Sequence, residues 1–245
     1  MSKITDNILF VPCNTKNHGP VRSLAAIRYL VYHYTANDGD TDMNNAKYYR
    51  DNVVGASAHY FVDDDSITQS VQDDVAAWAV GGPKYASCPQ TGGGKLHGFV
   101  TNSNSLSIEM CDMQRDGKIM SSEATQANAI ELGKMLMRKY DIPIENVVRH
   151  FDVTGKLCPA WLVDNDKWAA FKARLVEQEE NTVPRFDKIS DMPDWARPTI
   201  EKLCDKHLLN GSGGERDENG RPADLDLSMD MLRIYVVNDR AGIYG

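Results

Sequence analysis

Apolar positions recur with two different periods along residues 1–178. Short runs of aromatic and β-branched residues, bounded by turn formers, predict strands at 28–35, 106–111 and 146–150. Two further runs, 58–62 and 67–71, flank a polar turn and predict a hairpin. Apolar residues spaced by about 3.6 predict helices at 40–52, 121–140 and 165–178. Because strands and helices interleave, we expect an α/β domain with a mixed central β-sheet flanked by helices.

Three of these segments carry more specific expectations. His33 is expected near the C-terminal end of its strand, and the strand that begins near Leu106 is expected to end at a turn at 115–117. In the helix at 40–52, Met43, Ala46, Tyr48 and Tyr49 have the spacing of one buried stripe. Between the hairpin and the strand at 106–111, residues 81–104 are rich in glycine, proline, serine and asparagine. We expect a long irregular loop there, and loops of that length are often functional.

The chain changes character after residue 178. Residues 179–187 are polar and charged, which predicts a linker. Residues 188–245 then predict a helix from Asp191 to Cys204 and a second, capped helix that starts at Leu227. The sequence therefore predicts two domains, at 1–178 and 188–245, and the second is a small helical module with little core of its own.

Composition and charge exclude several classes of protein. The 245 residues are 42% hydrophobic and 25% charged, as in globular proteins, and the net charge is −8. Because no tract rich in lysine and arginine appears, nucleic acid is not expected as a partner. No stretch has the length of a membrane span or the pattern of a signal peptide. We therefore expect synthesis in the cytoplasm and no membrane insertion.

The five cysteines lack the repeated spacing of a disulfide framework, and we expect them to be reduced. Cys158 differs from the others because it lies eight residues after His150, in a segment that can place both side chains on one metal ion. His33, at the end of a predicted buried strand, is a candidate for the third ligand. Taken alone, His33 is more typical of a hydrogen-bonded core residue.

Two imidazoles and one thiolate are a ligand set that suits zinc. Three protein ligands leave the fourth tetrahedral position open for water or substrate, as in catalytic rather than structural sites. His33, His150 and Cys158 are therefore candidate ligands of a catalytic metal centre, and the spacing alone leaves a structural role for them open.

Four motifs in order carry a family resemblance over about residues 25–165. They are Tyr-His-Tyr-Thr-Ala-Asn at 32–37, Ser-Ala-His-Tyr-Phe-Val-Asp-Asp at 57–64, Asn-Ser-Leu-Ser-Ile-Glu at 104–109, and the segment from His150 to Pro159. With them the chain resembles the type 2 N-acetylmuramoyl-L-alanine amidases, which include phage lysozyme-type endolysins and share their fold with peptidoglycan recognition proteins. The resemblance implies zinc-dependent hydrolysis of the amide between N-acetylmuramic acid and L-alanine in peptidoglycan.

The same resemblance implies two catalytic residues. Glu109 lies in the apolar strand Leu-Ser-Ile-Glu-Met, where a carboxylate is costly without a partner, and it matches the family's base. Lys156 matches a lysine of relatives that stabilises negative charge on the carbonyl oxygen. The alternatives are a strand-edge glutamate and a surface lysine.

The chain departs from its relatives at two places. His59 stands where some relatives have a catalytic tyrosine, and we expect a structural or supporting role for it. Residues 78–81 are Trp-Ala-Val-Gly, where relatives often carry Trp-His-x-Gly, so substrate contacts at that edge differ.

The C-terminal module resembles one S-layer-homology-type repeat, which implies cell-wall binding or a homodimer through that module. The leading hypothesis is an endolysin or autolysin that reaches the cell wall after holin-type release. The alternatives are a non-catalytic peptidoglycan-binding protein and a cytoplasmic amidase that recycles muropeptides. Cys158 favours an enzyme, because binding-only relatives typically lack this ligand.

Overall fold

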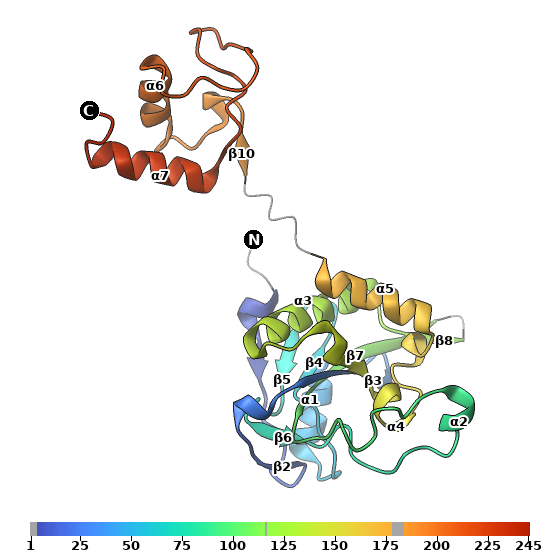
Figure 1. Cartoon of the computed structure of the whole chain (residues 1–245). Helices are drawn as coiled ribbons and strands as arrows, with labels where there is room; N and C mark the ends of the chain where they lie inside the picture. Colours follow the sequence, from blue (N-terminus) through green and yellow to red (C-terminus); the bar gives the residue numbers. More distant parts are fainter. Residues whose placement is uncertain (1–3, 116, 178–183) are drawn as a thin grey trace. The chain divides into compact units, whose positions relative to one another are not determined.

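The computed structural model describes residues 4–115, 117–177 and 184–245. The chain divides into two compact units, Met1–Glu177 and Gln178–Gly245, each of which is described by itself (Figure 1). Asp116 of the predicted turn and residues 179–183 of the predicted linker lie outside the described residues.

The first unit is built on a mixed, seven-stranded sheet within the described residues. Its strand order is β1-β5-β4-β7-β3-β9, and β8 pairs with β7. Strands β3, β4, β7 and β9 run parallel to their neighbours in this group, whereas β4–β5 and β7–β8 are antiparallel. The strands are β1 (Leu9–Phe10), β3 (Tyr29–Asp38), β4 (Tyr60–Val62), β5 (Ile67–Gln69), β7 (Ser105–Arg115), β8 (Lys118–Met120) and β9 (Val147–Arg149). The predicted mixed sheet is confirmed.

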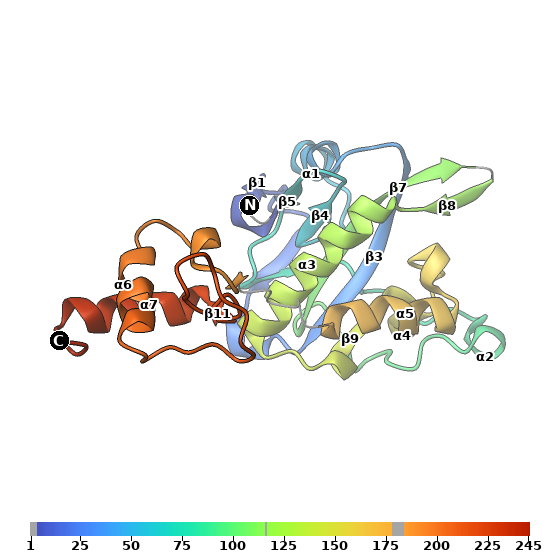
Figure 2. The ribbon, with the colours of Figure 1, turned by 90° about the horizontal axis from the view of Figure 1, so that it is seen from above.

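The helices of this unit start where the sequence places capping residues. Thr41, Ser122 and Asp164 each accept a hydrogen bond from a backbone N–H of the first turn that follows. The helices are α1 (Asp42–Asp51), α2 (Cys88–Thr91), α3 (Glu123–Tyr140), α4 (His150–Thr154) and α5 (Asn165–Val176). Helices α3 and α5 lie on one side of the sheet, and α1 and α4 on the other (Figures 1 and 2).

Alternation along the central strands separates the two faces of the sheet. Leu106, Ile108 and Met110 of β7 are buried in the main hydrophobic core with residues of α3 and α5. Ser107 and Glu109 point to the other face, because successive strand side chains alternate. On that face, Phe61 of β4 packs with α1. The polar side chains of Ser107 and Glu109 therefore project from the face of the sheet that carries α1 and α4.

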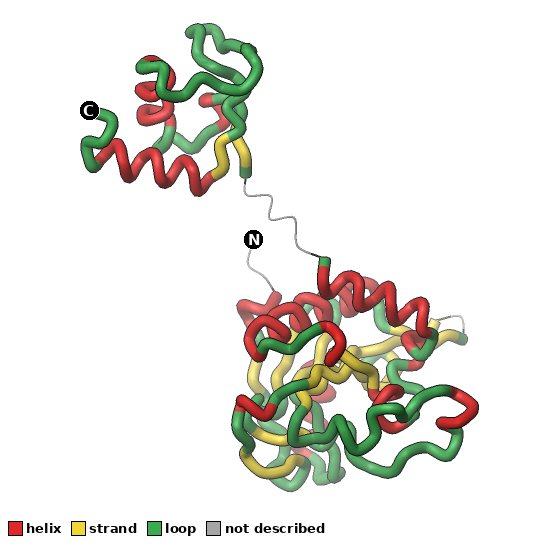
Figure 3. The backbone as a smooth tube through the Cα atoms, in the orientation of Figure 1, coloured by secondary structure: helices red, strands yellow, loops and turns green. Residues whose placement is uncertain are grey.

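Residues 81–104 form the irregular loop that the sequence predicts (Figure 3). The four-residue helix α2 is the regular element within it. Just before this loop, β6 (Val75–Ala77) pairs with β2 (His18–Val21) in a separate small sheet.

Three local predictions need correction. His150 does not end a strand or lie in a loop but is the first residue of α4. His33 is the fifth of ten residues in β3, because this strand continues to Asp38. Tyr48 is 51% exposed, and Asp42 and Asn45 join Ala46 on the buried face of α1 instead.

Over residues 184–245, the second unit combines two α-helices with a two-stranded sheet and is thus not purely helical. Helix α6 (Arg197–Asp205) begins later than predicted, because residues 189–191 form a separate 3₁₀ turn. Helix α7 (Met229–Arg240) starts after the capping Ser228, as predicted. Strand β10 (Arg185–Phe186), predicted as linker, pairs with β11 (Leu227–Ser228). Ten buried residues, among them Ile200 and Leu232, form a core separate from that of the first unit.

None of the helices in the described residues combines the length and the apolar character that a membrane span requires.

Candidate metal centre

Strand register places His33 beside Glu109. The two residues are Cα partners on the adjacent parallel strands β3 and β7, so their side chains emerge side by side on the face opposite α3 and α5. His33 is 2% exposed and its Nδ1 lies 3.8 Å from Oε1 of Glu109, whose side chain is 18% exposed. The regular pairing of β3 with β7 shifts after Tyr34, next to the left-handed Ala36. The sheet thus stays regular up to these two side chains.

A tight reversal brings His150 and Cys158 together. His150 opens α4, which ends at Gly155 with a φ of 87°, a conformation that favours glycine. The chain then returns, and the N–H of Phe151 donates to the carbonyl of Cys158 at 2.9 Å. Buried Arg149 holds the following residues in place by donating to the carbonyls of Leu162 and Val163. Both side chains are therefore positioned by backbone contacts rather than by a flexible loop.

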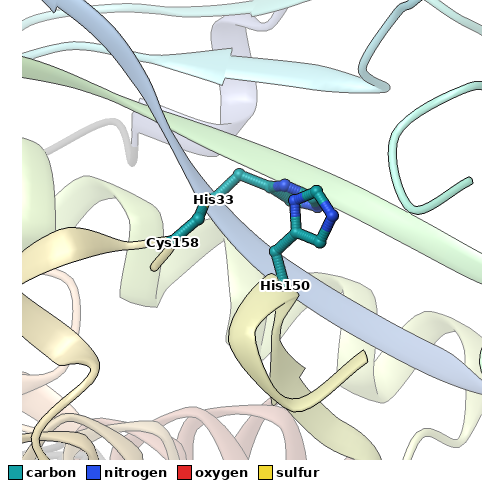
Figure 4. A group of neighbouring side chains, drawn as sticks. All are labelled: His33, His150 and Cys158. Atoms are coloured by element: carbon teal, nitrogen blue, oxygen red, sulfur yellow. The ribbon is translucent and has the colours of Figure 1, made fainter. Parts of the chain in front are cut away.

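His33, His150 and Cys158 form one cluster (Figure 4). One ligand atom from each lies within 4.8 Å of the others, and all three residues are buried. The two imidazole rings are 4.6 Å apart between centroids. A tetrahedral zinc ion with bonds of about 2.0–2.3 Å would hold such donors about 3.4–3.7 Å apart. A contraction of about 1 Å would therefore bring the three donors onto one ion.

The hydrogen bonding of the cluster fits a cation-binding site. Nε2 of His33, Nδ1 of His150 and Oε2 of Glu109 are buried and have no hydrogen-bond partner among the described residues. Buried polar atoms normally have partners, and leaving one unsatisfied costs about 1–3 kcal/mol. A metal ion would satisfy the two imidazole nitrogens, and a further ligand of that ion beside Glu109 would satisfy the carboxylate oxygen.

The protonation states of the ligands point the same way. Burial lowers the pKa of His33 well below its usual value and that of His150 to about 4, and the charge of Lys156 adds to both effects. Both imidazoles are therefore neutral near pH 7, with a lone pair free to coordinate. Burial also raises the pKa of the Cys158 thiol, so a thiolate there needs a cation beside it.

The carboxyl group of Glu109 has a raised pKa. Burial raises its pKa to about 8; the charge of Lys156 opposes this shift and that of Asp112 adds to it. A carboxyl group with a pKa near neutrality can both accept and return a proton.

Lys156 lies next to the cluster, with an exposed side chain. Its charge acts on His33, Glu109, His150 and Cys158 alike. The three candidate metal ligands, Glu109 and Lys156 thus lie close together on the α4 side of the sheet.

The comparisons with known proteins agree with this geometry. The model of the family described as N-acetylmuramoyl-L-alanine amidase matches residues 23–161, more than half of the chain. The chain belongs to this amidase family.

Two curated proteins from Bacillus species are similar to this chain. The N-acetylmuramoyl-L-alanine amidase CwlL of Bacillus licheniformis is 31% identical over 183 residues, which is 71% of this chain and 47% of CwlL. The N-acetylmuramoyl-L-alanine amidase BlyA of Bacillus subtilis (strain 168) is 35% identical over 184 residues, 71% of this chain and 47% of BlyA. The chain thus spans about half the length of these curated relatives.

Solved structures show the same fold. The catalytic domain of XlyA has a TM-score of 0.54 and 28% identity, covering 69% of this chain and 99% of that domain. The structure of PlyL has a TM-score of 0.55 and 27% identity, covering 69% of this chain and 96% of PlyL. The family match lies entirely within the first unit.

The two departures from the family have defined surroundings in this amidase domain. Both ring nitrogens of His59 are engaged, Nδ1 by Ser107 and Nε2 by the carbonyl of Val75, and Arg22 lies 3.0 Å from Nε2. The ring therefore connects the residue before β4 to β6 and β7, and neither of its nitrogens is left for substrate. Trp78 is 39% exposed, and the N–H groups of the next two residues donate to Asn102.

The sequence did not single out Lys84 and Tyr85. Both line a hollow that also contains His150 and Lys156. The available signal was a lysine and an aromatic residue within a glycine- and proline-rich loop, and this signal alone does not reveal which element the loop contacts.

Proposed function

We propose that this protein is a zinc-dependent N-acetylmuramoyl-L-alanine amidase that hydrolyses the amide between N-acetylmuramic acid and L-alanine in bacterial peptidoglycan. The proposal rests on one observation above all. In a chain of the amidase family, two neutral histidines and a buried cysteine converge beside an acidic residue with an elevated pKa.

His33, His150 and Cys158 would hold the zinc ion. When bound, the ion supplies Lewis acidity, because it lowers the pKa of a water molecule that it binds and polarises the amide carbonyl. The deep burial of the three side chains keeps other water away and strengthens the electrostatic interactions of the centre.

Glu109 and Lys156 then have separate tasks. Glu109 takes a proton from the attacking water and delivers it to the nitrogen of L-alanine as the amide bond breaks. The ammonium of Lys156 stabilises the negative charge that develops on the carbonyl oxygen. His59 takes no part in the proton transfer, since its nitrogens are engaged.

Two other functions are less well supported. A non-catalytic peptidoglycan-binding protein does not require Cys158 in the cluster or Glu109 beside it. A muropeptide-recycling amidase would act on the same bond, but that function does not require the second unit.

We assign the second unit to binding of the bacterial cell wall. Its separate core supports independent folding, and its S-layer-homology-type pattern supports wall binding; pairing of two copies through this unit is the alternative. With such a unit, the protein would act on the wall as a phage or prophage endolysin or an autolysin, after holin-type release from the cytoplasm.

Mass spectrometry of digested cell walls tests the proposed reaction. Cleavage of the amide releases stem peptides with free L-alanine amino termini and creates no new reducing sugars. New reducing ends without free L-alanine would show a glycosidase instead, and unchanged walls and muropeptides would contradict an enzyme.

A further inference from the structure

Two neighbouring hollows lie beside the candidate centre. The first, of about 480 Å³, is lined by His150, Lys156 and the loop from Gly81 to Ala86. The second, of about 450 Å³, shares Lys84 and Tyr85 with the first and adds Lys95. We call the two together the lysine hollow. None of the residues that line it is acidic.

Helix α4 fixes the loop that forms the lysine hollow. The N–H groups of Tyr85, Gly94 and Leu96 donate to the carbonyls of α4 residues at 2.8–2.9 Å. The loop also packs closely, since a Cβ added at Gly93 would lie 2.8 Å from the ring of Phe151. Because His150 is the first residue of α4, the lysines are held at a set position relative to a candidate metal ligand.

The charge of the lysine hollow is opposite to that of the chain. The protein carries a net charge of −8, yet Lys84, Lys95 and Lys156 line this one region. Among the ion pairs between described residues, none involves these three lysines. A concave, positively charged surface with unpaired ammonium groups attracts and orients an anionic ligand.

The proposed substrate has its negative charges on one side of the scissile amide. N-Acetylmuramic acid, whose lactyl carboxyl is consumed in the amide, is uncharged, whereas the stem peptide bears carboxylates. The nearest is the α-carboxylate of the D-glutamyl residue that follows L-alanine; in some walls this group is amidated. Charge complementarity therefore separates the two sides of the substrate.

We propose that the lysine hollow binds the D-glutamyl α-carboxylate of the stem peptide, chiefly through Lys84, and so places the peptide on the α4 side of the centre. This inference rests on the proposed amidase function. It makes Lys84 and Lys95 specificity residues, and it predicts a preference for acidic over amidated stem peptides.

A matched pair of substrates tests the inference. N-Acetylmuramoyl-L-Ala-γ-D-Glu-L-Lys and its D-isoglutamine counterpart differ in one charge. Lys84→Gln is expected to raise KM for the acidic substrate about 10-fold, the scale of one lost charge-assisted contact, with kcat little changed. The variant should leave KM for the amidated substrate unaltered. Lys95→Gln should act in the same direction with a smaller effect.

Lys167→Gln is the matched control, because Lys167 is an exposed lysine of α5, on the opposite side of the sheet. It should change neither KM. Equal effects of Lys84→Gln on both substrates, or no effect on either, would overturn the inference while leaving the amidase function intact.

Binding of the free peptide L-Ala-γ-D-Glu-L-Lys, measured by calorimetry, separates the two proposals. If no muropeptide is cleaved, the amidase function fails, but weaker peptide binding by Lys84→Gln than by Lys167→Gln would still support the lysine hollow. Equal binding by both variants would contradict it.

Discussion

The two faces of the central sheet use the same strands for different purposes. On the face toward α3 and α5, Tyr32 of β3 and Ile108 of β7 are fully buried in the main core. On the opposite face, the next residues along these strands, His33 and Glu109, are polar and in register. One face supplies apolar burial, and the other carries the candidate metal centre.

The two faces also differ in how they affect stability: one holds buried polar atoms without hydrogen-bond partners among the described residues, and the other holds the apolar core. Among the residues that the structure describes, buried atoms of His33, Glu109 and His150 have no hydrogen-bond partner, and each such atom costs stability unless a ligand satisfies it. The main core on the other face buries apolar residues of β3, β4, β5 and β7, and this burial stabilises the sheet. Substitutions on the two faces should therefore have separable effects, on turnover in one case and on stability in the other.

The largest effect is expected from Cys158→Ser. A serine hydroxyl is a much poorer zinc ligand than a thiolate, so zinc content should fall far below one per chain and amidase turnover should fall to background. Metal analysis and a muropeptide assay measure the two quantities. Because the core toward α3 and α5 is untouched, the circular dichroism spectrum should be unchanged. Full zinc and full turnover in this variant would refute the ligand set.

Glu109→Gln should reduce kcat by about 10²–10⁴-fold, the usual contribution of a general base, while zinc stays near one per chain. The contrasting variant is Ile108→Val, one residue earlier on β7 and on the other face. It should cost about 0.5–1.5 kcal/mol of unfolding free energy with kcat little changed. Unimpaired turnover in Glu109→Gln would remove this residue from the mechanism.

Gly133→Ala probes the packing of α3 on the sheet. A Cβ at Gly133 would lie 2.0 Å from the hydroxyl oxygen of Tyr32 and 2.9 Å from Leu175. Although alanine favours helices by about 1 kcal/mol over glycine, the overpacking should lower the unfolding free energy by about 1–3 kcal/mol.

Urea denaturation measures this loss, and turnover at low temperature should be preserved. Tyr32→Phe removes the hydroxyl and should make Gly133→Ala less costly, at the expense of the hydrogen bond to Ala129. Additive losses in the double variant would show that the close approach is relieved elsewhere.

Deleting residues 184–245 should have the smallest effect on catalysis. All five residues of the centre belong to the first unit, so turnover of a soluble muropeptide should stay nearly constant. Sedimentation with purified cell walls should weaken markedly if the second unit binds the wall. Proportional losses in both assays would count against a targeting role.

Much of this architecture was predictable because it follows from local patterns. The run around His33, the alternation at Leu106–Met110 and the capped helix after Ser122 have clear periods, and the structure has all three elements. The proximity of His150 to Cys158 was also predictable, because only seven residues separate them.

The remainder depends on contacts between distant parts of the chain. Strands β1 and β8, of two and three residues, were not predicted; each becomes a strand by pairing with a longer-range or turn-connected neighbour, β5 and β7 respectively. Helix α4 is a single turn stabilised by Arg149 and by the return of the chain at Cys158. The loop that carries Lys84 is ordered by carbonyls of α4, about seventy residues away in sequence, so its place beside His150 could not be predicted.

X-ray absorption at the zinc edge, on protein purified without added chelator, tests the central claim most directly. The account predicts one zinc per chain with one sulfur ligand at about 2.3 Å and two imidazole nitrogens at about 2.0–2.1 Å. A spectrum without sulfur, or protein that binds no zinc when the metal is supplied in excess, would contradict it.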